Sequence, residues 1–401
     1  MRSSLILVLL CFLSPLMHAQ DLEPCFFENT QERYGANQHL MDAVINNIDV
    51  GKVDTRQELV IPVVVHVVYR LDSEDIPDEQ ILEQMEVLNT AFSGESLTNA
   101  QVPKVFSSSS TAVNFQFCLA DTDPSGQPTS GITRKEVELL NIGASSNLFY
   151  DDFGGKDAWD TDRYINIWVA ETGGLFIGKA SFPGVDPKPE QGIVMDVNFF
   201  GGLKSLSGTG SFDEGKTLVH EMGHYFGLEH LWGSDLSDCS SEDGIADTPK
   251  TGSTYLNTCL DQSFSCGSTD MTGNYMMYTS DACLHYFTKG QKERMRLILA
   301  QYRSDLLSTN TNCDSGFNQE DAFSLKKIQS GPNGILFGLH GPIDPSKAQA
   351  LLYDTKGCLL WNKEVSSLEQ FYLPMQERAF GMYFLVVSTG EELISERIVW
   401  Y

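Results

Sequence analysis

The pattern of apolar and polar residues predicts an α/β domain between residues 57 and 308. Residues 59–69 are a continuously apolar, β-branched run, which is typical of a buried strand. Residues 77–92 carry apolar side chains at helical spacing, begin with a proline and are followed by Gly94, which indicates an amphipathic helix that stops there. Shorter apolar or alternating runs predict strands at 113–119, 164–170 and 192–197 and an edge strand at 175–182.

A last helix of this domain is predicted from Thr288 to about Tyr302, because Thr288-Lys289-Gly290-Gln291 matches a capping box. His66 and His285 fall on or beside these elements, and we expect both to be structural. Cys118 lies on the alternating strand, where an inert buried thiol is expected.

The composition changes after about Ser308, through a segment rich in Asn, Thr, Ser and Gly, into a final module at 309–401. Short strands are predicted there at 334–340, 347–353, 358–361, 382–388 and 393–401. A succession of short strands without helices predicts an all-β sandwich.

The N-terminus matches a secretory signal peptide at residues 1–19. A basic start at Arg2 is followed by the apolar run Leu5–Leu13 and the small residue Ala19. This run is too short to span a bilayer, and no other segment approaches the ~20 apolar residues that a span needs. We therefore expect no membrane span, and no lipid anchor at Cys11, which small residues do not precede.

The net charge is strongly acidic, with 27 Lys and Arg against 54 Asp and Glu, or −27. This charge repels nucleic acid and anionic membrane surfaces, so a nucleic-acid partner is not expected.

The most informative segment is residues 220–230, which spell H-E-x-x-H-x-x-G-x-x-H. His220 and His224 are four residues apart and share one helix face, and Gly227 can take a positive φ that turns the chain and brings His230 to the same ion. Three ligands leave a fourth position of Zn²⁺ for water, whose proton Glu221 can take as general base. Unliganded histidines on a packed helix are the alternative, which the presence of only 8 His in 401 residues disfavours.

Downstream, Asn274-Tyr275-Met276-Met277-Tyr278 resembles the Met-turn of the metzincin proteases. The resemblance implies a twisted mixed sheet with helices above an irregular lower lobe. It makes Met276 the methionine beneath the metal and Tyr278 the residue that stabilises the oxyanion of the tetrahedral intermediate. It also implies that the edge strand at 175–182 lies above the cleft, where a substrate peptide adds as an extended strand.

Within that clan the chain resembles the pappalysin-like family of secreted endopeptidases over most of residues 57 to 305. The motifs that carry the resemblance are residues 61–68, 131–134, 159–161, 165–169, 182–184 and 247–249. Two positions depart from the family pattern: Met277 stands where Asp or a similar polar residue is common, and Cys25-Phe26 replaces a Cys-Gly pair. Neither departure touches a zinc ligand.

Four cysteines follow the zinc motif and allow three pairings. The family resemblance implies the disulfides Cys239 with Cys266 and Cys259 with Cys283, which would staple the irregular lobe. A second zinc site is the alternative, although the spacing lacks C-x-x-C.

Cys25 stands between the signal peptide and the first strand. In related proenzymes a propeptide cysteine occupies the open zinc position, so the resemblance implies a propeptide at 20–56 and a latent precursor, with Arg56 as a processing point. The alternative is an unpaired or mispaired surface cysteine.

Specific roles are expected for acidic residues at two places, a calcium-binding turn and the wall of a substrate pocket. The turn 243–249 is rich in oxygen ligands, and the resemblance implies Ca²⁺ at Asp243 and Thr248; a plain acidic turn is the alternative. Asp281 is the acidic residue nearest the expected wall of the S1′ pocket, where it would favour Arg or Lys after the scissile bond.

In the final module, Gly381-Met382-Tyr383-Phe384-Leu385, Gly390 and Ile398-Val399 resemble the C-terminal sorting domain of the bacterial type IX secretion system. The resemblance implies the secretion machinery as a partner and a secreted or cell-surface location in a gram-negative bacterium. A generic adhesive or spacing sandwich is the alternative.

Together these features predict a secreted zinc endopeptidase that hydrolyses peptide bonds in proteins and is made as a latent precursor. A non-catalytic exported zinc protein is the competing class, and Glu221 argues against it because a structural site has no need of a base. A metal-dependent hydrolase of small esters or amides is a second enzyme alternative.

Overall fold

The structure is a computed structural model that divides into two compact units, Met1–Cys313 and Asp314–Tyr401. It describes residues 57–95, 97, 102–183, 185–202, 211–233, 239–260 and 263–307 of the first unit, and 324–331, 334–340, 349–354, 358–365, 370–376, 378–379, 381–388 and 393–400 of the second. The predicted signal peptide and propeptide, with Cys25 and Arg56, lie outside the described residues.

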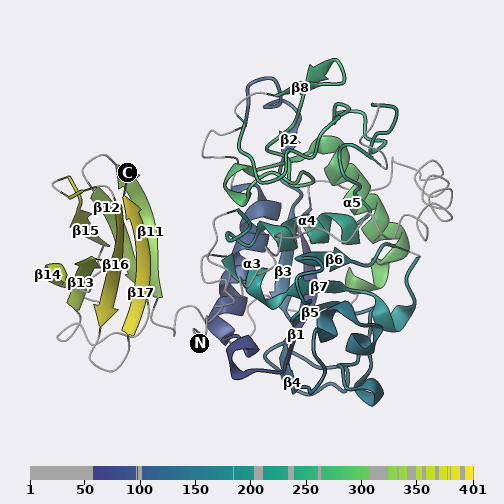
Figure 1. Ribbon diagram of the computed structural model, residues 1–401, viewed down its shortest axis with the longest axis horizontal. Coiled ribbons are helices and arrows are strands. Elements are labelled where there is room, and N and C mark those ends of the chain that lie inside the picture. Colours follow the sequence, from purple (N-terminus) through teal and green to yellow (C-terminus); the bar gives the residue numbers. More distant parts are fainter. Residues whose placement is uncertain are drawn as a thin grey trace, which may run out of the picture. The chain divides into compact units, whose positions relative to one another are not determined.

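A six-stranded mixed sheet forms the centre of the first unit (Figure 1). β1 (Leu59–Tyr69) pairs in parallel with β3 (Phe115–Leu119), β4 (Ile132–Glu136) and β5 (Ile165–Ala170). β5 pairs in parallel with β7 (Ile193–Asp196), and the short β6 (Gly178–Ala180) runs antiparallel to β7 at one edge of the sheet. The predicted edge strand is thus confirmed. β4 was not predicted, because its sequence ITRKE is polar and its side chains are half-buried or exposed.

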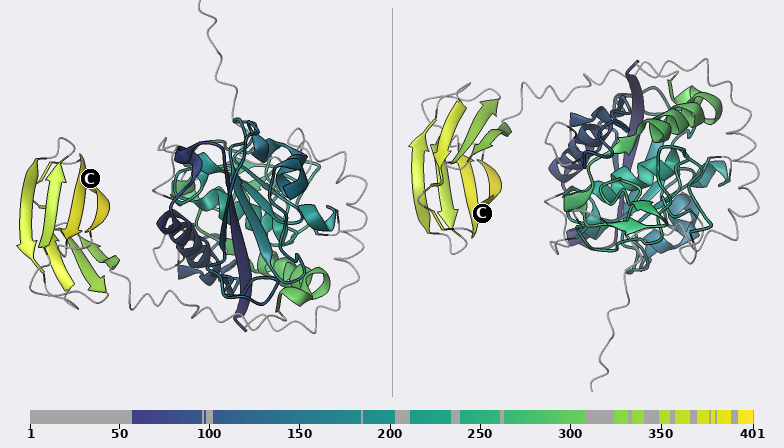
Figure 2. Two further views of the ribbon diagram at one scale, coloured as in Figure 1. Left: turned by 90° about the horizontal axis from the view of Figure 1, so that it is seen from below. Right: turned by 90° about the horizontal axis from the view of Figure 1, so that it is seen from above.

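Three helices accompany this sheet: α3 (Asp78–Ser93), α4 (Lys216–Tyr225) and α5 (Lys289–Tyr302). α3 ends before Gly94, and α5 begins with the predicted capping box between Thr288 and Gln291. Alternate side chains of β1 and β5 pack with all three helices in one large core, and β1 lies beside α3 in both views of Figure 2. The opposite face of the sheet packs on the irregular segment around residues 137–158.

Short 3-10 helices connect many of these elements. They are η3 (Asp72–Glu74), η5 (Ile142–Ala144), η6 (Ser146–Phe149), η7 (Asp151–Phe153), η8 (Lys188–Glu190), η9 (Val197–Phe199), η11 (Asp281–Cys283) and η12 (Ser304–Leu307). Among the helices of the described residues, none combines the length and apolar character needed to cross a membrane.

The chain between α4 and α5 is irregular. Its strands are the two-residue β8 (Phe264–Ser265), β9 (Ser268–Thr269) and β10 (Phe287–Thr288), and β10 pairs with β2 (Ser110–Thr111). The disulfides Cys239–Cys266 and Cys259–Cys283 cross-link it, as the family resemblance implied. A second zinc site at these cysteines is therefore excluded, because all four sulfurs are bonded in pairs and none is a thiolate that could bind zinc.

Cys118 was expected to be an inert thiol, and that expectation is wrong. Cys118 is disulfide-bonded, and its partner lies outside the described residues. Its strand β3 is an outer strand of the sheet, so another part of the chain can reach it. The alternating sequence indicates burial, which Cys118 has at 7% exposure, but burial does not distinguish a thiol from a disulfide.

The second unit consists of two antiparallel sheets, with strand orders β11-β12-β15 and β14-β13-β16-β17. The strands are β11 (Ser324–Gly331), β12 (Gly334–His340), β13 (Gln349–Asp354), β14 (Leu359–Glu364), β15 (Gln370–Pro374), β16 (Gly381–Ser388) and β17 (Leu393–Trp400). Apolar residues from both sheets, including Phe337, Leu352, Phe371 and Leu385, share one core, which makes the unit a sandwich as predicted. β11 and β15 were not predicted.

Candidate active site

Three histidines converge at the end of α4. The Nε2 atoms of His220, His224 and His230 lie 3.0 to 3.1 Å from one another, and all three rings are buried. Two ligands of a tetrahedral zinc with Zn–N bonds of ~2.0–2.1 Å stand about 3.3 Å apart, so the three nitrogens fit this ion closely. Within the described part of the chain, this group of side chains has the arrangement of a metal site.

Backbone carbonyls orient two of these rings. Nδ1–H of His220 donates to the carbonyl oxygen of Tyr275 (2.7 Å), and Nδ1–H of His224 donates to that of Leu228 (2.7 Å). A carbonyl can only accept, so the proton of each neutral ring is on Nδ1 and the lone pair of Nε2 faces the common centre. The chain thereby presents the tautomer that binds a metal.

Burial also keeps the histidines neutral. It lowers the pKa of His220 to about 4, although the bond to Tyr275 partly opposes this shift. Burial, with repulsion from the neighbouring rings, holds the pKa values of His224 and His230 well below the usual 6.5. A proton therefore does not compete with a cation for these nitrogens at neutral pH.

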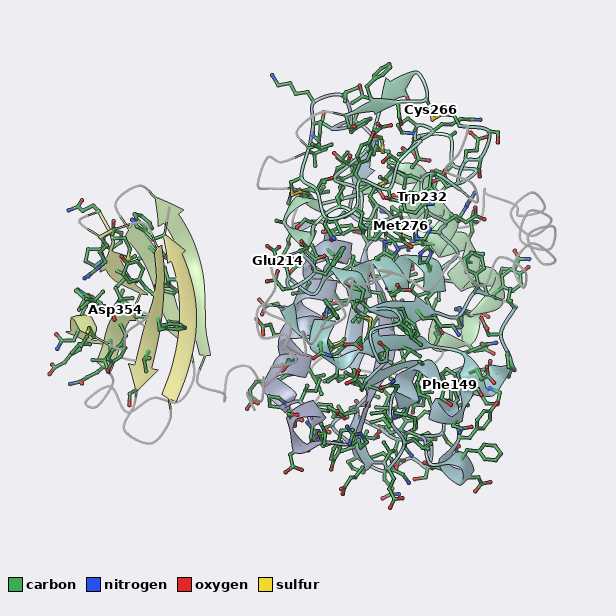
Figure 3. The ribbon with its side chains drawn as sticks, in the orientation of Figure 1. Phe149, Glu214, Trp232, Cys266, Met276 and Asp354 are labelled. Atoms are coloured by element: carbon green, nitrogen blue, oxygen red, sulfur yellow. A yellow bond between two sulfur atoms is a disulfide. The ribbon has the colours of Figure 1, made fainter. Side chains whose placement is uncertain are left out.

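The turn after α4 brings the third histidine into place. The helix ends at Tyr225, and Gly227 has a φ of 82°, the left-handed conformation predicted for it. The ring of His230 then stacks on Trp232, with centroids 4.3 Å apart and planes inclined by 15°. Trp232 is labelled in Figure 3. Sequence reasoning missed this residue, because no spacing rule assigns a stacking partner two positions after a ligand.

Met276, labelled in Figure 3, packs against α4 at Gly223. A Cβ added at Gly223 on that helix would stand 2.5 Å from the sulfur of Met276, so the close contact requires a glycine there. The turn is held by Asn274, whose side-chain oxygen accepts the N–H of Met276 (3.0 Å).

Asn274 also links the turn to α5. Its amide exchanges two hydrogen bonds with Gln291, of 2.8 and 3.0 Å, and Gln291 belongs to the capping box of that helix. Both amides are fully buried. Because Tyr275, the next residue, accepts from His220, the start of α5 is connected to a metal-binding ring through the Met-turn.

Tyr278 and Glu221 complete the surroundings of the histidines. The ring of Tyr278 lies 4.7 Å from that of His230 and 5.6 Å from that of His220, measured between centroids. Glu221 is fully buried on α4 between the first two histidines and faces Gly178 of the edge strand β6. A phenol therefore lies beside two of the imidazoles, and the carboxylate of Glu221 faces an edge strand whose backbone can pair with a peptide.

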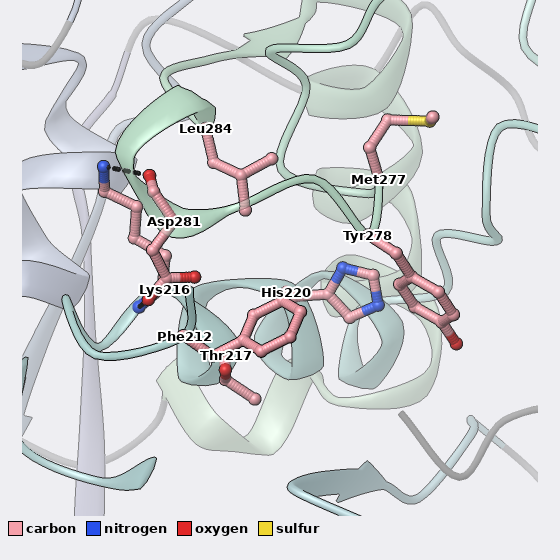
Figure 4. A pocket seen from close by; sticks show the side chains of 8 residues that line it. All are labelled: Phe212, Lys216, Thr217, His220, Met277, Tyr278, Asp281 and Leu284. Atoms are coloured by element: carbon pink, nitrogen blue, oxygen red, sulfur yellow. Dashed lines mark hydrogen bonds between the residues drawn. The ribbon is translucent and has the colours of Figure 1, made fainter. Parts of the chain in front are cut away.

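A pocket opens beside His220. Figure 4 shows Asp281 and Lys216 at one end and the His220 ring with Tyr278 at the other. Its lining residues are Phe212, Lys216, Thr217, His220, Met277, Tyr278, Asp281 and Leu284. Of these, His220, Tyr278 and Asp281 were predicted as site residues from the sequence, and Met277 was noted there as a departure from the family pattern.

Asp281 is 1% exposed at this pocket. Its Oδ2 accepts the backbone N–H groups of Glu214 (3.0 Å) and Lys216 (3.1 Å), whereas its Oδ1 is buried without a hydrogen-bond partner among the described residues. Burial raises the pKa of Asp281 to about 7, although the two N–H groups and the charge of Lys216 oppose the rise. The Lys216 ammonium donates to the carbonyl oxygen of Asp281 (2.6 Å) and pairs with Glu214 (3.0 Å).

The acidic turn predicted to bind calcium brings its two named residues together. Oδ1 of Asp243 lies 2.7 Å from the hydroxyl of Thr248 and accepts the N–H of Ile245 (3.0 Å). Oδ2 of Asp243 is buried without a hydrogen-bond partner in the described structure, and burial raises the pKa of this carboxyl to about 7. Nearby, Asp247 accepts from Thr288 and from the N–H of Gly290 at the start of α5.

His66 is structural, as expected. It is fully buried, with Nδ1 2.7 Å from the Thr133 hydroxyl and Nε2 2.9 Å from the side-chain oxygen of Asn166.

Comparison with known proteins places this site in a family. A peptidase family M43 model, described as pregnancy-associated plasma protein-A, matches residues 149–300. Extracellular metalloproteases of Arthroderma benhamiae and Trichophyton verrucosum are each 27% identical over 238 residues, which covers 52% of this chain and 80% of theirs.

Solved structures of mirolysin agree. A Tannerella forsythia promirolysin mutant is 35% identical, with a TM-score of 0.62, and the match covers 71% of this chain and 97% of that chain. Mature mirolysin from the same organism, in complex with a cleaved peptide, is 37% identical, with a TM-score of 0.55 and coverage of 63% and 96%.

The chain therefore belongs to the pappalysin-like M43 family of zinc metalloendopeptidases and is related to mirolysin. The predicted function, a secreted zinc-dependent endopeptidase, is confirmed at this level.

Proposed function

We propose that this endopeptidase cleaves an extended peptide laid along β6, with Glu221 as general base and Tyr278 as oxyanion-stabilising residue. The observation that carries the proposal is the convergence of three Nε2 atoms within 3.1 Å at the end of α4, with Glu221 on the same helix beneath the edge strand. His220, His224 and His230 would hold the zinc.

Bound zinc supplies a Lewis acid that polarises the scissile carbonyl and lowers the pKa of water. Glu221 would take a proton from the attacking water and pass it to the leaving amine, a task that suits a buried carboxylate beside the metal ligands. The Tyr278 hydroxyl would donate to the oxyanion, because the tyrosine ring borders two of the three imidazoles. The edge strand β6 would pair with the peptide backbone and hold it in register.

Hydrolysis of casein by the mature enzyme tests these roles. Glu221→Ala should abolish cleavage while the protein still binds one zinc ion per chain, and Tyr278→Phe should lower kcat with little change in KM. A zinc-loaded Glu221→Ala variant that still cleaves casein would refute the general-base role. Wild-type activity on small esters but not on casein would favour the alternative hydrolase.

The pocket supports a preference for a cationic side chain after the scissile bond. Its walls include Phe212, Met277 and Leu284, and Oδ1 of Asp281 has no hydrogen-bond partner within the described part of the chain. A long apolar stem with a charged tip matches such a lining, which favours Arg or Lys. Cleavage of a peptide library by wild type and Asp281→Ala tests this, and an unchanged preference would refute it.

Calcium at Asp243 and Thr248 is supported by Oδ2 of Asp243, which has no hydrogen-bond partner among the described residues, and by the neighbouring oxygens of Thr248 and Ile245. A hard cation suits such ligands, and it would offset the cost of burying the carboxylate. Calcium should raise the Tm of wild type but not of Asp243→Asn. Equal shifts in both proteins would point to a plain acidic turn.

Latency through Cys25 rests on the sequence and on the existence of a promirolysin form among the relatives. Cys25→Ala should make the precursor active before cleavage and should not alter the mature enzyme. A Cys25–Cys118 disulfide in the precursor, detected by mass spectrometry, would contradict this role, because a bonded Cys25 sulfur could not bind the zinc.

The second unit would serve as a type IX sorting domain, which its separate β-sandwich core supports. The location would then be the surface or exterior of a gram-negative cell. Removal of residues 314–401 should leave protease activity intact but retain the enzyme inside such a cell. Normal export of the truncated chain would instead favour a spacing or adhesive module.

A further inference from the structure

Gly178 approaches the side chain of Glu221 more closely than any other residue type could. It is the first residue of β6, at the edge of the sheet. A Cβ built on Gly178 would stand 2.7 Å from Cγ and 2.7 Å from Oε1 of Glu221, and 3.0 Å from Cδ. These distances are well inside the usual contact distance of ~3.5–4.0 Å between carbon atoms. With Glu221 in this position, only glycine fits at residue 178.

The backbone conformation is not the reason for this glycine. Gly227 has a positive φ, whereas Gly178 is not among the described residues with positive φ and is part of a regular strand. An alanine could therefore adopt the same backbone conformation without strain. What excludes a side chain at residue 178 is the carboxylate opposite it.

The surroundings determine which partner would move if a methyl group were added. β6 is paired with β7 through Met195, Val194 and Ile193, and α4 is buried in the main core. The clashing atoms are Cγ, Cδ and Oε1 of Glu221, and all three move when this side chain turns about its rotatable bonds. The carboxylate would therefore shift before the strand or the helix did.

We propose that Gly178 is a positioning residue for catalysis: by lacking a side chain, it sets where the Glu221 carboxylate stands beneath the edge strand. This inference rests on the proposed role of Glu221. The same strand would hold the substrate backbone. Because Glu221 packs directly against this strand at Gly178, the strand sets the distance between the base and the scissile peptide bond. Nothing in the sequence around residue 178 marks this role, because glycines are common in loops and at strand ends.

Gly178→Ala tests the inference in the mature, zinc-loaded enzyme. A displacement of about 1 Å in a catalytic group can cost about a hundredfold in rate, so we expect kcat to fall between about tenfold and a hundredfold. KM should change by less than about twofold, because the loss is realised in the transition state. Zinc content should stay at one ion per chain, and Tm should fall by no more than about 4 °C.

Gly143→Ala is the matched control. Gly143 also has an ordinary φ, but its Cβ would meet the backbone oxygen of Glu171 at 2.9 Å and Cγ2 of Thr172 at 3.1 Å, and a backbone oxygen cannot turn aside as a long side chain can. That variant should lose Tm while its folded fraction keeps the wild-type kcat. If the clash at residue 178 displaces Glu221, Gly178→Ala should lower kcat with little change in Tm, whereas Gly143→Ala should lower Tm with little change in kcat.

A double-mutant cycle with Glu221→Ala, measured in the free energy of unfolding, separates the clash with Glu221 from a general effect on the strand. Alanine removes Cγ, Cδ and Oε1, the atoms that a Cβ at residue 178 would meet, so Gly178→Ala should cost less unfolding free energy in that background than in wild type. Equal costs in both backgrounds, or a wild-type kcat for Gly178→Ala, would overturn the inference. Activity of zinc-loaded Glu221→Ala would instead refute the general-base proposal itself.

Discussion

Asp281 should make the selectivity of this protease depend on pH. Its buried carboxyl has a pKa raised to about 7, and its Oδ1 has no hydrogen-bond partner in the described structure. The ionised form attracts a cationic side chain in the pocket, whereas the protonated form does not. A preference for Arg over an uncharged residue after the scissile bond should therefore strengthen as pH rises through 7.

The magnitude follows from the titration. With a pKa of about 7, the carboxyl is about 9% ionised at pH 6 and about 91% ionised at pH 8. The preference should rise about tenfold across this interval, which corresponds to about 1.4 kcal/mol. Binding of a substrate with Arg at this position favours the ionised form and lowers the pKa of Asp281 in the complex. The tenfold change therefore applies to kcat/KM, which reports on the free enzyme.

The assay compares two peptides that differ only in Arg or Leu after the scissile bond. The ratio of their kcat/KM values between pH 6 and pH 8 cancels the titration of Glu221 and of any other group common to both reactions. Asp281→Asn keeps an acceptor for the two backbone N–H groups and should give a low, pH-independent ratio. A wild-type ratio that stays flat with pH, or a persistent Arg preference in Asp281→Asn, would refute the reasoning.

Three further outcomes are expected. Burial lowers the pKa of His66 from 6.5 to about 4, so the folded protein favours the neutral ring. Up to about 3 kcal/mol of stability, present above pH 6.5, should therefore be lost as the pH falls towards 4. Denaturant unfolding at pH 7 and pH 4 should show a smaller effect of pH in His66→Gln than in wild type, and equal effects would contradict this. Gln291→Met removes both hydrogen bonds between the buried amides of Asn274 and residue 291 and should cost about 2–4 kcal/mol in unfolding free energy and weaken zinc retention against a chelator. Glu293→Met, at an exposed position on the same helix, should do neither. Removal of zinc should lower Tm reversibly, because the ion binds only the folded arrangement of the three histidines; calorimetry that shows the same Tm with and without chelator would argue against a resident metal.

Much of the fold was predictable because its signals are local. The buried run of β1, the helical spacing of α3 and the capping box of α5 each depend on residues close together in sequence. The polar β4 and the strands β11 and β15 escaped prediction because pairing with neighbours, rather than their own pattern, makes them strands. For Cys118, a local pattern indicated burial correctly but not the disulfide, which depends on a distant part of the chain.

The metal ligands and the base lie within eleven consecutive residues, so helix geometry and one glycine turn were enough to deduce their arrangement. Other features depend on segments that meet only after folding. Gln291 binds the Met-turn residue Asn274, and Asp281 accepts from the backbone of Glu214 and Lys216. Gly178 meets Glu221 in the same way, through packing of elements that are far apart in sequence. The spacing of residues along the chain was enough to identify the metal ligands and the base. The positions of these groups relative to the substrate strand and the pocket depend on how separate elements pack together.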